Sequence, residues 1–396
     1  MTDVVRIEAV DGRARGLRTR RAGDRFGPLE VVRRLDALLL VAVLGALAYG
    51  LWAIDGITKY APGGSALDRQ ALYAGVGVAL MVAALFVDPA IYRRFAGVIY
   101  TAFLAVMAFV LATGAVTRGS KRWITAGGFT FQPSEFGKLL LALCLAAFVA
   151  NSFRKAHDLT VALRTIGLAA VPILLVFAQP DFGTALVYAA VLAAVLFVSG
   201  IRWVLLAAIG GAALIVALSV LWLLPAAGIN VLKPYQAARL TGFTHPASDP
   251  SAATYQVTQS ITTVGAGGLR GRGVAGATQT SLGYLPADTT DFAFASLAEQ
   301  RGFLGVAVLL LLYLLVVWRG LRIVAGAGDL FGATVAAGIS FAFLFQVYVN
   351  VGMTIGIAPI TGITLPFVSV GGSSMISNLA AMGILQAIHA RGRRRR

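Results

Sequence analysis

One carboxylate stands out as a candidate catalytic group because of the residues around it. Asp291 lies near the end of a long polar interval, from about Pro225 to Gly302, and is followed at once by Phe292-Ala293-Phe294-Ala295. An ionisable group at the edge of an apolar segment is costly in a membrane and is therefore a candidate functional residue. There it could act as a general base towards a hydroxyl group. A solvated acid beside a helix start is the alternative interpretation.

A second pair of charges lies in the stretch Gln132-Pro133-Ser134-Glu135-Phe136-Gly137-Lys138. The proline favours the first turn of a helix. Glu135 and Lys138 are three positions apart and would share one face of that helix. Two charges near a membrane are tolerable only if they pair or face a cavity. We therefore expect either an ion pair that locks helices together or, with Ser134, part of a substrate site.

Two further helix starts carry polar groups. Asp181, in Gln179-Pro180-Asp181, is placed to accept hydrogen bonds from the first free N–H groups of a helix. Capping is the first interpretation of Asp181, and contact with substrate is the alternative. The run Gly371-Gly372-Ser373-Ser374 could hold a phosphate on the exposed N–H groups of a helix start. Close packing of helices explains Ser373 and Ser374 at least as well.

The long polar interval contributes four more candidate substrate contacts. Gln259 and Ser260 fall on one face of a short amphipathic helix, which we expect at the membrane interface. The glycine-rich run 265–273 is no Walker loop, because it lacks the Gly-Lys-Ser/Thr ending. We expect it to form tight turns that present Arg270 and Arg272 to a lipid headgroup.

Membrane-spanning helices must position all of these groups. Of 396 residues, 58% are hydrophobic and only 13% are charged, whereas about a quarter of the residues of a soluble protein are charged. The composition predicts an all-α, polytopic membrane protein. No cleavable signal peptide is expected, because a polar, Arg-rich stretch precedes the first apolar run. At about 20 apolar residues per span, we expect ten transmembrane helices near 35–54, 71–88, 95–114, 133–151, 162–179, 181–200, 203–224, 303–321, 331–355 and 366–389.

This map divides the chain into an Arg-rich cytoplasmic tail (1–34), a ten-helix domain (35–390) and a basic cytoplasmic tail (391–396). A large extracytoplasmic loop (225–302) joins helices seven and eight. The positive-inside rule supports the map, because it places 22 of the 33 Lys and Arg residues on the cytoplasmic side. The net charge of +16 is thus assigned to membrane orientation rather than to nucleic acid. Arg118, Lys121 and Arg122 then gather on the outer face as candidate contacts for an anionic substrate.

The sequence contains no motif for binding a metal. The only cysteine, Cys144, lies in an apolar run, which excludes an intramolecular disulfide and a cysteine cluster. His157, His245 and His389 are far apart and share no ligand spacing. We therefore name no metal ligand and no certain cofactor.

An outer-face cavity with cations, a carboxylate and apolar walls suits a lipid-linked anionic substrate. Chemistry outside the cytoplasm has no ATP supply, so the energy must arrive with the substrate, and a polyprenyl-diphosphate sugar meets that need. Asp291 would act as base on an acceptor hydroxyl, and basic residues or a divalent cation (Mg or Mn) would stabilise the departing diphosphate. Inverting glycosyl transfer needs only one base. The residues alone indicate an outer-face membrane protein for a lipid-linked phosphate.

Six stretches closely resemble the SEDS (shape, elongation, division and sporulation) family of peptidoglycan polymerases. In family order they are FQPSEFGK (131–138), QPDFGTAL (179–186), QSITTVGAGGLRGRG (259–273), TQTSLGYLP (278–286), TDFAFASLAE (290–299) and TGITLPFVSVGGSSMISN (361–378). Ten spans and a large outer loop between the seventh and eighth also fit that fold. The Thr361-Gly362-Ile363 lead-in is more similar to the rod-elongation branch (RodA) than to the division branch (FtsW).

The resemblance implies a bacterial cytoplasmic-membrane enzyme that polymerises lipid II into β-1,4 glycan and releases undecaprenyl diphosphate. It assigns catalysis to Asp291 and places Glu135 and Lys138 in the same cavity. It also implies a class B penicillin-binding protein as the partner that supplies transpeptidation. Recruitment by the elongation or the division machinery is left open.

The chain departs from the family pattern just before Asp291. The family usually reads Pro-Glu-x-His-Thr-Asp, whereas Ala287 and Thr289 stand here for the Glu and the His, and Asp288 is an additional acid. Val370 replaces a usual Tyr. A lipid II flippase and a non-catalytic scaffold of the wall-synthesis complex are the alternative functions. A flippase would tolerate Asp291→Asn, and a scaffold would keep its partner through every cavity mutation.

Overall fold

The computed structural model describes residues 27–59, 66–113, 115–117, 120–126, 129–152, 159–228 and 252–392. Several of the predictions concern residues outside these ranges: residues 1–26 of the tail, Arg118, residues 229–251 of the expected loop, His157, His245 and Arg393–Arg396. For Lys121 only the backbone is described.

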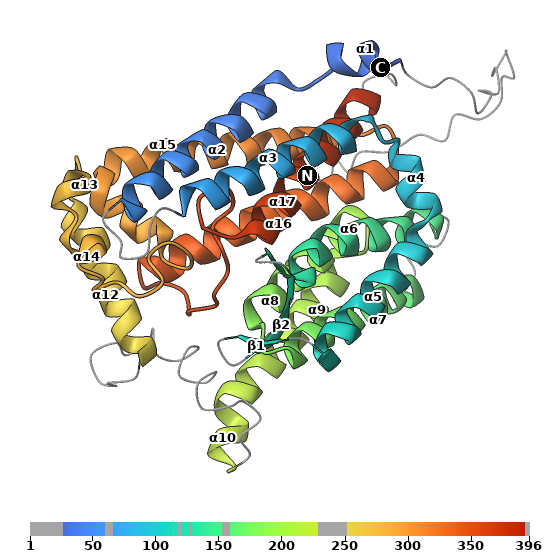
Figure 1. The fold of residues 1–396 in the computed structure, drawn as a ribbon. Coiled ribbons are helices and arrows are strands. Elements are labelled where there is room, and N and C mark those ends of the chain that lie inside the picture. The colour runs from blue at the N-terminus through green and yellow to red at the C-terminus, as the bar shows by residue number, and fades with distance from the viewer. Residues whose placement is uncertain are drawn as a thin grey trace, which may run out of the picture.

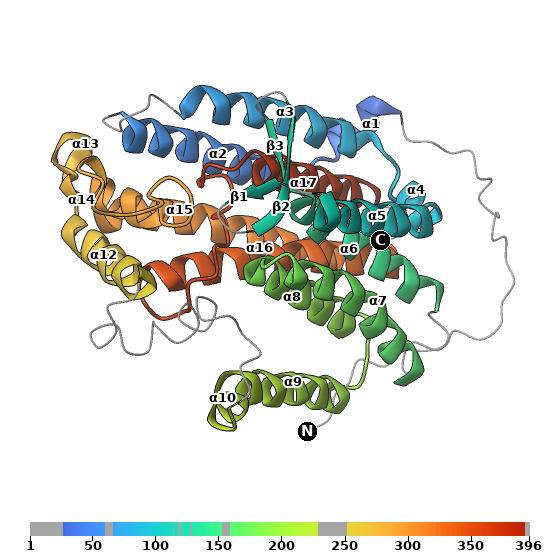
Figure 2. The same cartoon turned by 60° about the horizontal axis from the view of Figure 1, so that its bottom comes forward.

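Long helices pack side by side to form the molecule, and a helix occupies most of each of the ten predicted spans (Figures 1 and 2). They are α2 (Ala37–Thr58), α3 (Leu67–Phe86), α5 (Ala96–Thr113), α6 (Pro133–Asn151), α7 (Leu159–Ala178), α8 (Phe182–Val198), α9 (Trp203–Leu218), α15 (Ala293–Gly326), α16 (Leu330–Thr354) and α17 (Gly372–Gly392). By length and composition, seven of them could cross a membrane: α2, α3, α5, α6, α7, α15 and α16. Helices α8 and α9 are shorter apolar helices.

Short polar residues and prolines set where several of these helices begin. The side chains of Asp36, Asp181 and Asp329 each accept a hydrogen bond from a backbone N–H in the first turn of α2, α8 and α16. Pro133 occupies the first turn of α6, where its missing N–H costs nothing. The cap that the sequence predicted for Asp181 is therefore confirmed.

The two ends of the bundle can be named by an acid that lies at each. At the Asp291 end, α6, α8, α15 and α17 begin and α2 and α16 finish. At the Asp36 end, α2 begins and α15 and α17 finish. Three short helices, α12 (Ala252–Gly267), α13 (Gly273–Gly276) and α14 (Thr278–Ser281), lie at the Asp291 end beside the start of α15 (Figures 1 and 2).

The interval 225–302, predicted as a large loop with one short amphipathic helix, contains several helical segments. Before the undescribed residues, Ser219–Leu223 form a π-helical turn and Leu224–Ala226 the helix α10. After them, α15 begins at Ala293 rather than near residue 303, with a break at Gly302, whose φ is +66°. The polar Glu299-Gln300-Arg301 sequence suggested a loop, but the helical segment 293–300 is buried. Ser296 and Glu299 of this segment are hydrogen-bonded to neighbouring residues, which makes their burial tolerable.

Two further predictions need correction. The all-α description omits a small antiparallel sheet between α5 and α6, in the order β1 (Ala115–Thr117), β2 (Ser120–Ala126) and β3 (Phe129–Phe131). The end of the predicted tail is also ordered, because α1 (Pro28–Arg33) buries Val31 against Leu85 and Ala390.

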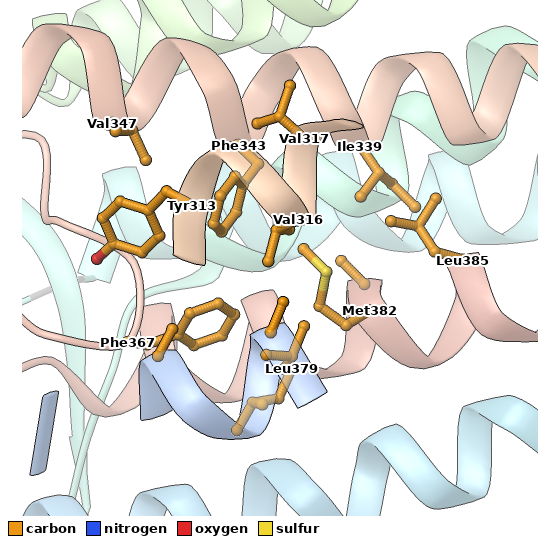
Figure 3. Packing of buried hydrophobic residues seen from close by; sticks show 14 of the residues in the cluster. Tyr313, Val316, Val317, Ile339, Phe343, Val347, Phe367, Leu379, Met382 and Leu385 are labelled. Atoms are coloured by element: carbon orange, nitrogen blue, oxygen red, sulfur yellow. The ribbon is translucent and has the colours of Figure 1, made fainter. Parts of the chain in front are cut away.

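The largest core lies where α2, α15, α16 and α17 meet (Figure 3). Tyr313 and Phe343 stack edge to face with ring centroids 5.5 Å apart, and Phe367 lies 5.8 Å from Phe343. The Tyr313 hydroxyl donates to the carbonyl of Pro366 at 2.5 Å. Phe367 is fully buried although its φ is +65°. The core thus fixes the segment before α17 in an unusual conformation.

A second core, around α5, α6, α7 and α8, packs on the first through α16. Helix α9 stands off from the other long helices in Figure 2. Its first turns touch the rest of the molecule through a small cluster built on Ala162, Leu196 and Ile201.

Candidate active site

Asp291 lies directly before α15, with its side chain partly exposed while the residues that follow it are buried. Its backbone carbonyl accepts a hydrogen bond from Asn350 Nδ2 at 2.9 Å. Beside its carboxylate is Gly362, whose φ is +71°, and a Cβ on that glycine would lie 3.6 Å from Asp291 Oδ2. A glycine at this position takes the left-handed conformation without strain and places no side chain beside the acid.

The loop between α16 and α17 holds the backbone just before Asp291. Val370 N–H donates to the carbonyl of Thr289 at 2.8 Å, and Ser369 Oγ donates to the carbonyl of Thr290 at 2.5 Å. Gln70, buried in α3, donates to the carbonyl of Ser369 at 3.1 Å and accepts from Gly371 N–H at 3.2 Å. Val370 acts here through its backbone, so the replacement of the usual Tyr leaves this contact in place.

The departures from the family pattern lie in a tight turn before Asp291. Ala287 has a φ of +53°, and its carbonyl accepts from the N–H groups of Thr290 and Phe292 at 3.1 Å each. Asp288 is partly buried, and this burial raises the pKa of its carboxyl, while backbone N–H groups oppose the rise. Its carbonyl accepts from Ser296 Oγ at 3.1 Å. The turn is thus fixed by its own backbone together with contacts from Ser296 and from the loop before α17.

The predicted pair of charges in α6 forms a buried ion pair. Lys138 Nζ lies 2.6 Å from Glu135 Oε2 and donates to Gln346 Oε1 on α16 at 2.7 Å. A small cavity adjoins the pair. Its lining comes from α6, α16 and α17 and includes Ser377 and Asn378. The geometry meets both conditions for burying such charges, since they pair and face a cavity.

Asp181 joins three elements at the same end of the bundle. Besides capping α8, its carboxylate accepts from Gln132 Nε2 at 2.8 Å and from Ser134 Oγ at 3.4 Å. Arg122 of β2 lies 3.4 Å from it as an ion pair, with a quarter of the Arg122 side chain exposed. The buried Arg122 Nε has no hydrogen-bond partner among the described residues. Arg122 thus has donors beyond those that Asp181 uses.

The two serines at the start of α17 link these groups to the loop. Ser373 Oγ accepts from Gln132 N–H at 2.8 Å, and Ser374 Oγ lies 2.8 Å from Thr364 Oγ1. Asn378 Nδ2 donates to the Ser374 carbonyl at 2.9 Å. Both serines are buried. Their hydroxyls thus connect α17 to the start of α6 and to the loop beside Asp291.

Of the two predicted contacts on α12, the side chain of Ser260 has a partner within the protein. Helix α12 packs on α15 and α16 rather than lying free at an interface, and Ser260 is fully buried with Oγ donating to Thr354 O at 2.8 Å. Gln259 is partly exposed, and its carbonyl accepts from Thr263 Oγ1 at 2.6 Å. The apolar side of α12, with Val257 and Val264, explains why the helix is covered.

The glycine-rich run forms the expected tight turn, and the backbone of this turn packs against the break in α15 at Gly302. Gly267, Gly271 and Gly302 approach the opposite backbone too closely for a side chain. Phe303 N–H donates to the carbonyl of Gly268 at 2.9 Å, so the turn satisfies groups freed by the break. Arg270 and Arg272 are exposed at this turn, beside the C-terminal end of the helical segment 293–301. Asp291 lies before the N-terminal end of the same segment. That segment spans on the order of 13 Å.

Four residues of the site were missed by the sequence analysis: Gln70, Gln346, Asn350 and Glu299. Gln346 and Asn350 do carry a signal, because they are four positions apart and therefore on one face of an otherwise apolar helix. Glu299 accepts hydrogen bonds from Gln279 N, Thr280 N and Thr280 Oγ1, at 2.7–3.0 Å, and so caps α14. Nothing local in the sequence predicts that partner. In the described ranges, no three His, Cys, Asp or Glu residues gather as metal ligands.

Comparison with known proteins gives consistent matches along nearly the whole chain. Residues 34–394 match the family model FTSW_RODA_SPOVE, described as "Cell cycle protein". Peptidoglycan glycosyltransferase MrdB of Escherichia coli K12 is 36% identical over 364 residues, covering 90% of this chain and 93% of the relative. Stage V sporulation protein E of Bacillus subtilis strain 168 is 36% identical over 356 residues, covering 88% and 93%.

Two solved structures are similar in fold. The first is described as "Structural coordination of polymerization and crosslinking by a peptidoglycan synthase complex". It has a TM-score of 0.77 and 31% identity, and the match covers 91% of this chain and 99% of that one. The Rod shape determining protein RodA of Thermus thermophilus has a TM-score of 0.66 and 28% identity, covering 91% and 98%.

Proposed function

The chain belongs to the family of FtsW, RodA and SpoVE cell cycle proteins, and from that membership we infer that it is a peptidoglycan glycosyltransferase of a bacterial membrane. Its relatives carry that activity in their names, and its motifs lie together at one end of the bundle. The finer assignments below concern the residues that would carry the reaction, the substrate and the partner.

We propose that Asp291 is the general base. The observation that carries this assignment is a partly exposed carboxylate on a backbone fixed from two sides, with the side-chain-free Gly362 beside it. The acceptor hydroxyl of a lipid II sugar would approach through that space. Its oxygen forms the new bond to the anomeric carbon of the donor, and its proton passes to Asp291. The bond from the anomeric carbon to the diphosphate breaks, and undecaprenyl diphosphate leaves with the electron pair.

The departing diphosphate needs positive charge near it. Arg122 has donors that Asp181 does not use, and it lies above the start of α8. We assign it, with Arg118 and Lys121, to the diphosphate. Lys138 is engaged by Glu135 and Gln346, so we assign it to the wall of the cavity and to recognition of the bound sugar or its lipid. A divalent cation remains the alternative stabiliser of the leaving group.

The orientation and partner follow from the same family membership. Both termini would be cytoplasmic, and the Asp291 end would face the cell exterior, in agreement with the distribution of Lys and Arg. A class B penicillin-binding protein would bind the chain and cross-link its product. The similarity to a chain from a peptidoglycan synthase complex supports that partnership.

The test is gel-resolved glycan synthesis from purified lipid II by the chain copurified with its class B partner. Asp291→Asn should abolish polymer while leaving the complex and its thermal stability intact. Asp36→Asn, an acid at the opposite end, is the matched control and should still polymerise. Equal polymer from wild type and Asp291→Asn would remove the base assignment, and no polymer from an intact wild-type complex would favour a flippase or a scaffold.

A further inference from the structure

Asn350 is a fully buried polar residue in the last turns of α16 that the mechanism above does not use. Its amide nitrogen donates to two backbone carbonyls, Asp291 O at 2.9 Å and Ile363 O at 2.8 Å. These carbonyls lie on two segments that are not neighbours in the sequence, one before α15 and the other in the loop before α17. The two hydrogens of one amide group thus join both segments to a third element.

The two carbonyls belong to residues at the contact between Asp291 and Gly362. One belongs to Asp291 itself, and the other belongs to Ile363, the residue after Gly362; a Cβ on Gly362 would lie 3.6 Å from Asp291 Oδ2. The separation between Asp291 and Gly362 therefore depends on one donor, Asn350 Nδ2, which holds the backbone on both sides. Helix α16 is an apt support for that donor, because it packs on α6, α8 and α15.

Two other features indicate that this geometry needs support. The turn before Asp291 contains Ala287 at a φ of +53°, and the wall opposite contains Phe367 at +65°. Residues other than glycine persist in this conformation only where surrounding contacts hold them. Without the amide, both carbonyls would lose this donor, the buried carbonyl of Ile363 at the greater cost, and the two segments could separate.

We propose that Asn350 is the positioning residue for the catalytic base, holding the Asp291 carboxylate and the Gly362 wall at the separation that the acceptor hydroxyl requires. The proposal rests on the role of Asp291 proposed above. Asn350 acts through Asp291 and does not touch the reacting atoms. Its loss should therefore lower turnover and leave the binding of lipid II unchanged.

Asn350→Leu tests the proposal, because leucine has the same branching and the same number of non-hydrogen side-chain atoms as asparagine but no donor. A general base contributes about 10²–10⁴-fold to a rate, and a misplacement of about 1 Å can cost about 10²-fold. We expect kcat to fall about 10²-fold, with KM for lipid II within about twofold of wild type. Asn350→Ser keeps one donor, so its kcat should lie between those of wild type and Asn350→Leu. It serves as the test if the leucine variant does not fold.

Gln386→Leu is the matched control for a purely structural role. Gln386 is also buried, and its amide also makes two hydrogen bonds to backbone, donating to Asp36 O and accepting from Asp36 N at 2.9 Å each, at the far end of the bundle. Both variants should lower the thermal stability to a similar extent. Only Asn350→Leu should lower the kcat of the folded complex.

The outcomes separate the two proposals when Asp291→Asn is assayed beside these variants. An inactive Asp291→Asn with a fully active Asn350→Leu would overturn the positioning role and keep the base. A fall in kcat together with a matching loss of lipid II binding would also overturn it, because Asn350 would then shape the binding site. An active Asp291→Asn would remove the base itself, whatever the Asn350 variants do.

Discussion

The two ends of the bundle both hold buried charged and amide groups, but they use them differently. At the Asp36 end, Asp36 caps α2 through one oxygen and pairs with Arg319 through the other, with Arg319 Nε at 2.7 Å and Nη2 also donating. Gln386 completes the cluster by bonding both backbone groups of Asp36. Asp36 thereby connects the start of α2 to the last turns of α15 and α17, and each of its polar atoms has a partner.

The Asp291 end is left partly open. Four buried side-chain atoms there have no hydrogen-bond partner among the described residues: Arg122 Nε, Gln300 Oε1, Arg301 Nε and Asn350 Oδ1. Pro180, Ala287 and Phe367, the three non-glycine residues with positive φ in the described part of the chain, also lie at this end. Unpaired polar atoms and backbone strain both cost stability and tend to gather at functional sites. A closed polar cluster thus stabilises the bundle at the Asp36 end, whereas the Asp291 end keeps buried polar atoms without a partner among the described residues.

The largest expected contrast is between the two acids. Asp291→Asn should lower kcat by about 10²–10⁴-fold, the usual contribution of a general base, with little change in thermal stability. Asp36→Asn should keep kcat but lower the free energy of unfolding by about 3 kcal/mol, since it leaves Arg319 without its buried partner. Polymer assays and the fraction of folded protein after heating measure the two effects. Loss of activity in both variants at equal folded fraction would contradict the division of roles.

The Glu135–Lys138 pair is the place where both roles meet. Lys138→Met should lower the free energy of unfolding by about 3–5 kcal/mol, because it leaves Glu135 buried without a counter-charge. The double variant Glu135→Gln with Lys138→Met should recover most of that stability. If the pair also contacts substrate, as we propose, the stable double variant will have a raised KM for lipid II. Full recovery of both stability and KM would make the pair a lock between helices alone.

Gly362 offers a sharper probe of the space beside the base. Gly362→Ala places a methyl group about 3.6 Å from Asp291 Oδ2 and should cost about 1–2 kcal/mol for its left-handed backbone. We also expect kcat to fall about tenfold, since the methyl group narrows the approach of the acceptor. Gly283→Ala is the control, because Gly283 has the same φ of +71° and a Cβ there would meet nothing within 4 Å. An equal kcat in the two alanine variants would show that the space beside Asp291 is not used.

The smallest expected effect concerns Asp288. Burial raises the pKa of its carboxyl in the folded protein, so the folded state holds this proton to a higher pH than the unfolded state does. The contribution of Asp288 to stability is therefore present below the unfolded pKa and is lost as the pH rises through the folded pKa. Asp288→Asn should remove that loss and slightly raise the melting temperature at neutral pH relative to wild type, while polymer synthesis continues. A variant that melts lower at neutral pH, or makes no polymer, would give Asp288 a larger role.

Much of the architecture could be predicted from the sequence because it depends on local chemistry. The apolar runs locate the long helices, and proline and aspartate locate several of their starts, as at Pro133 and Asp181. The i, i+3 spacing placed Glu135 and Lys138 on one helical face, and the ion pair that they form was one of the two interpretations of that spacing. The small sheet and the early start of α15 were not predicted, since both depend on neighbours that cover polar backbone.

The apolar runs alone are enough to predict a membrane protein and the positions of its long helices. The polar groups that are already satisfied become apparent only when the helices are packed together. Ser260 donates to Thr354, and Arg319 pairs with Asp36 across 283 positions of the chain. The physical reason is that a hydrogen bond depends on ångström-scale proximity, which spacing along a sequence sets only within a single helix or turn. The joint support of Asp291 and Ile363 by Asn350 is of this kind, because it needs three elements packed together.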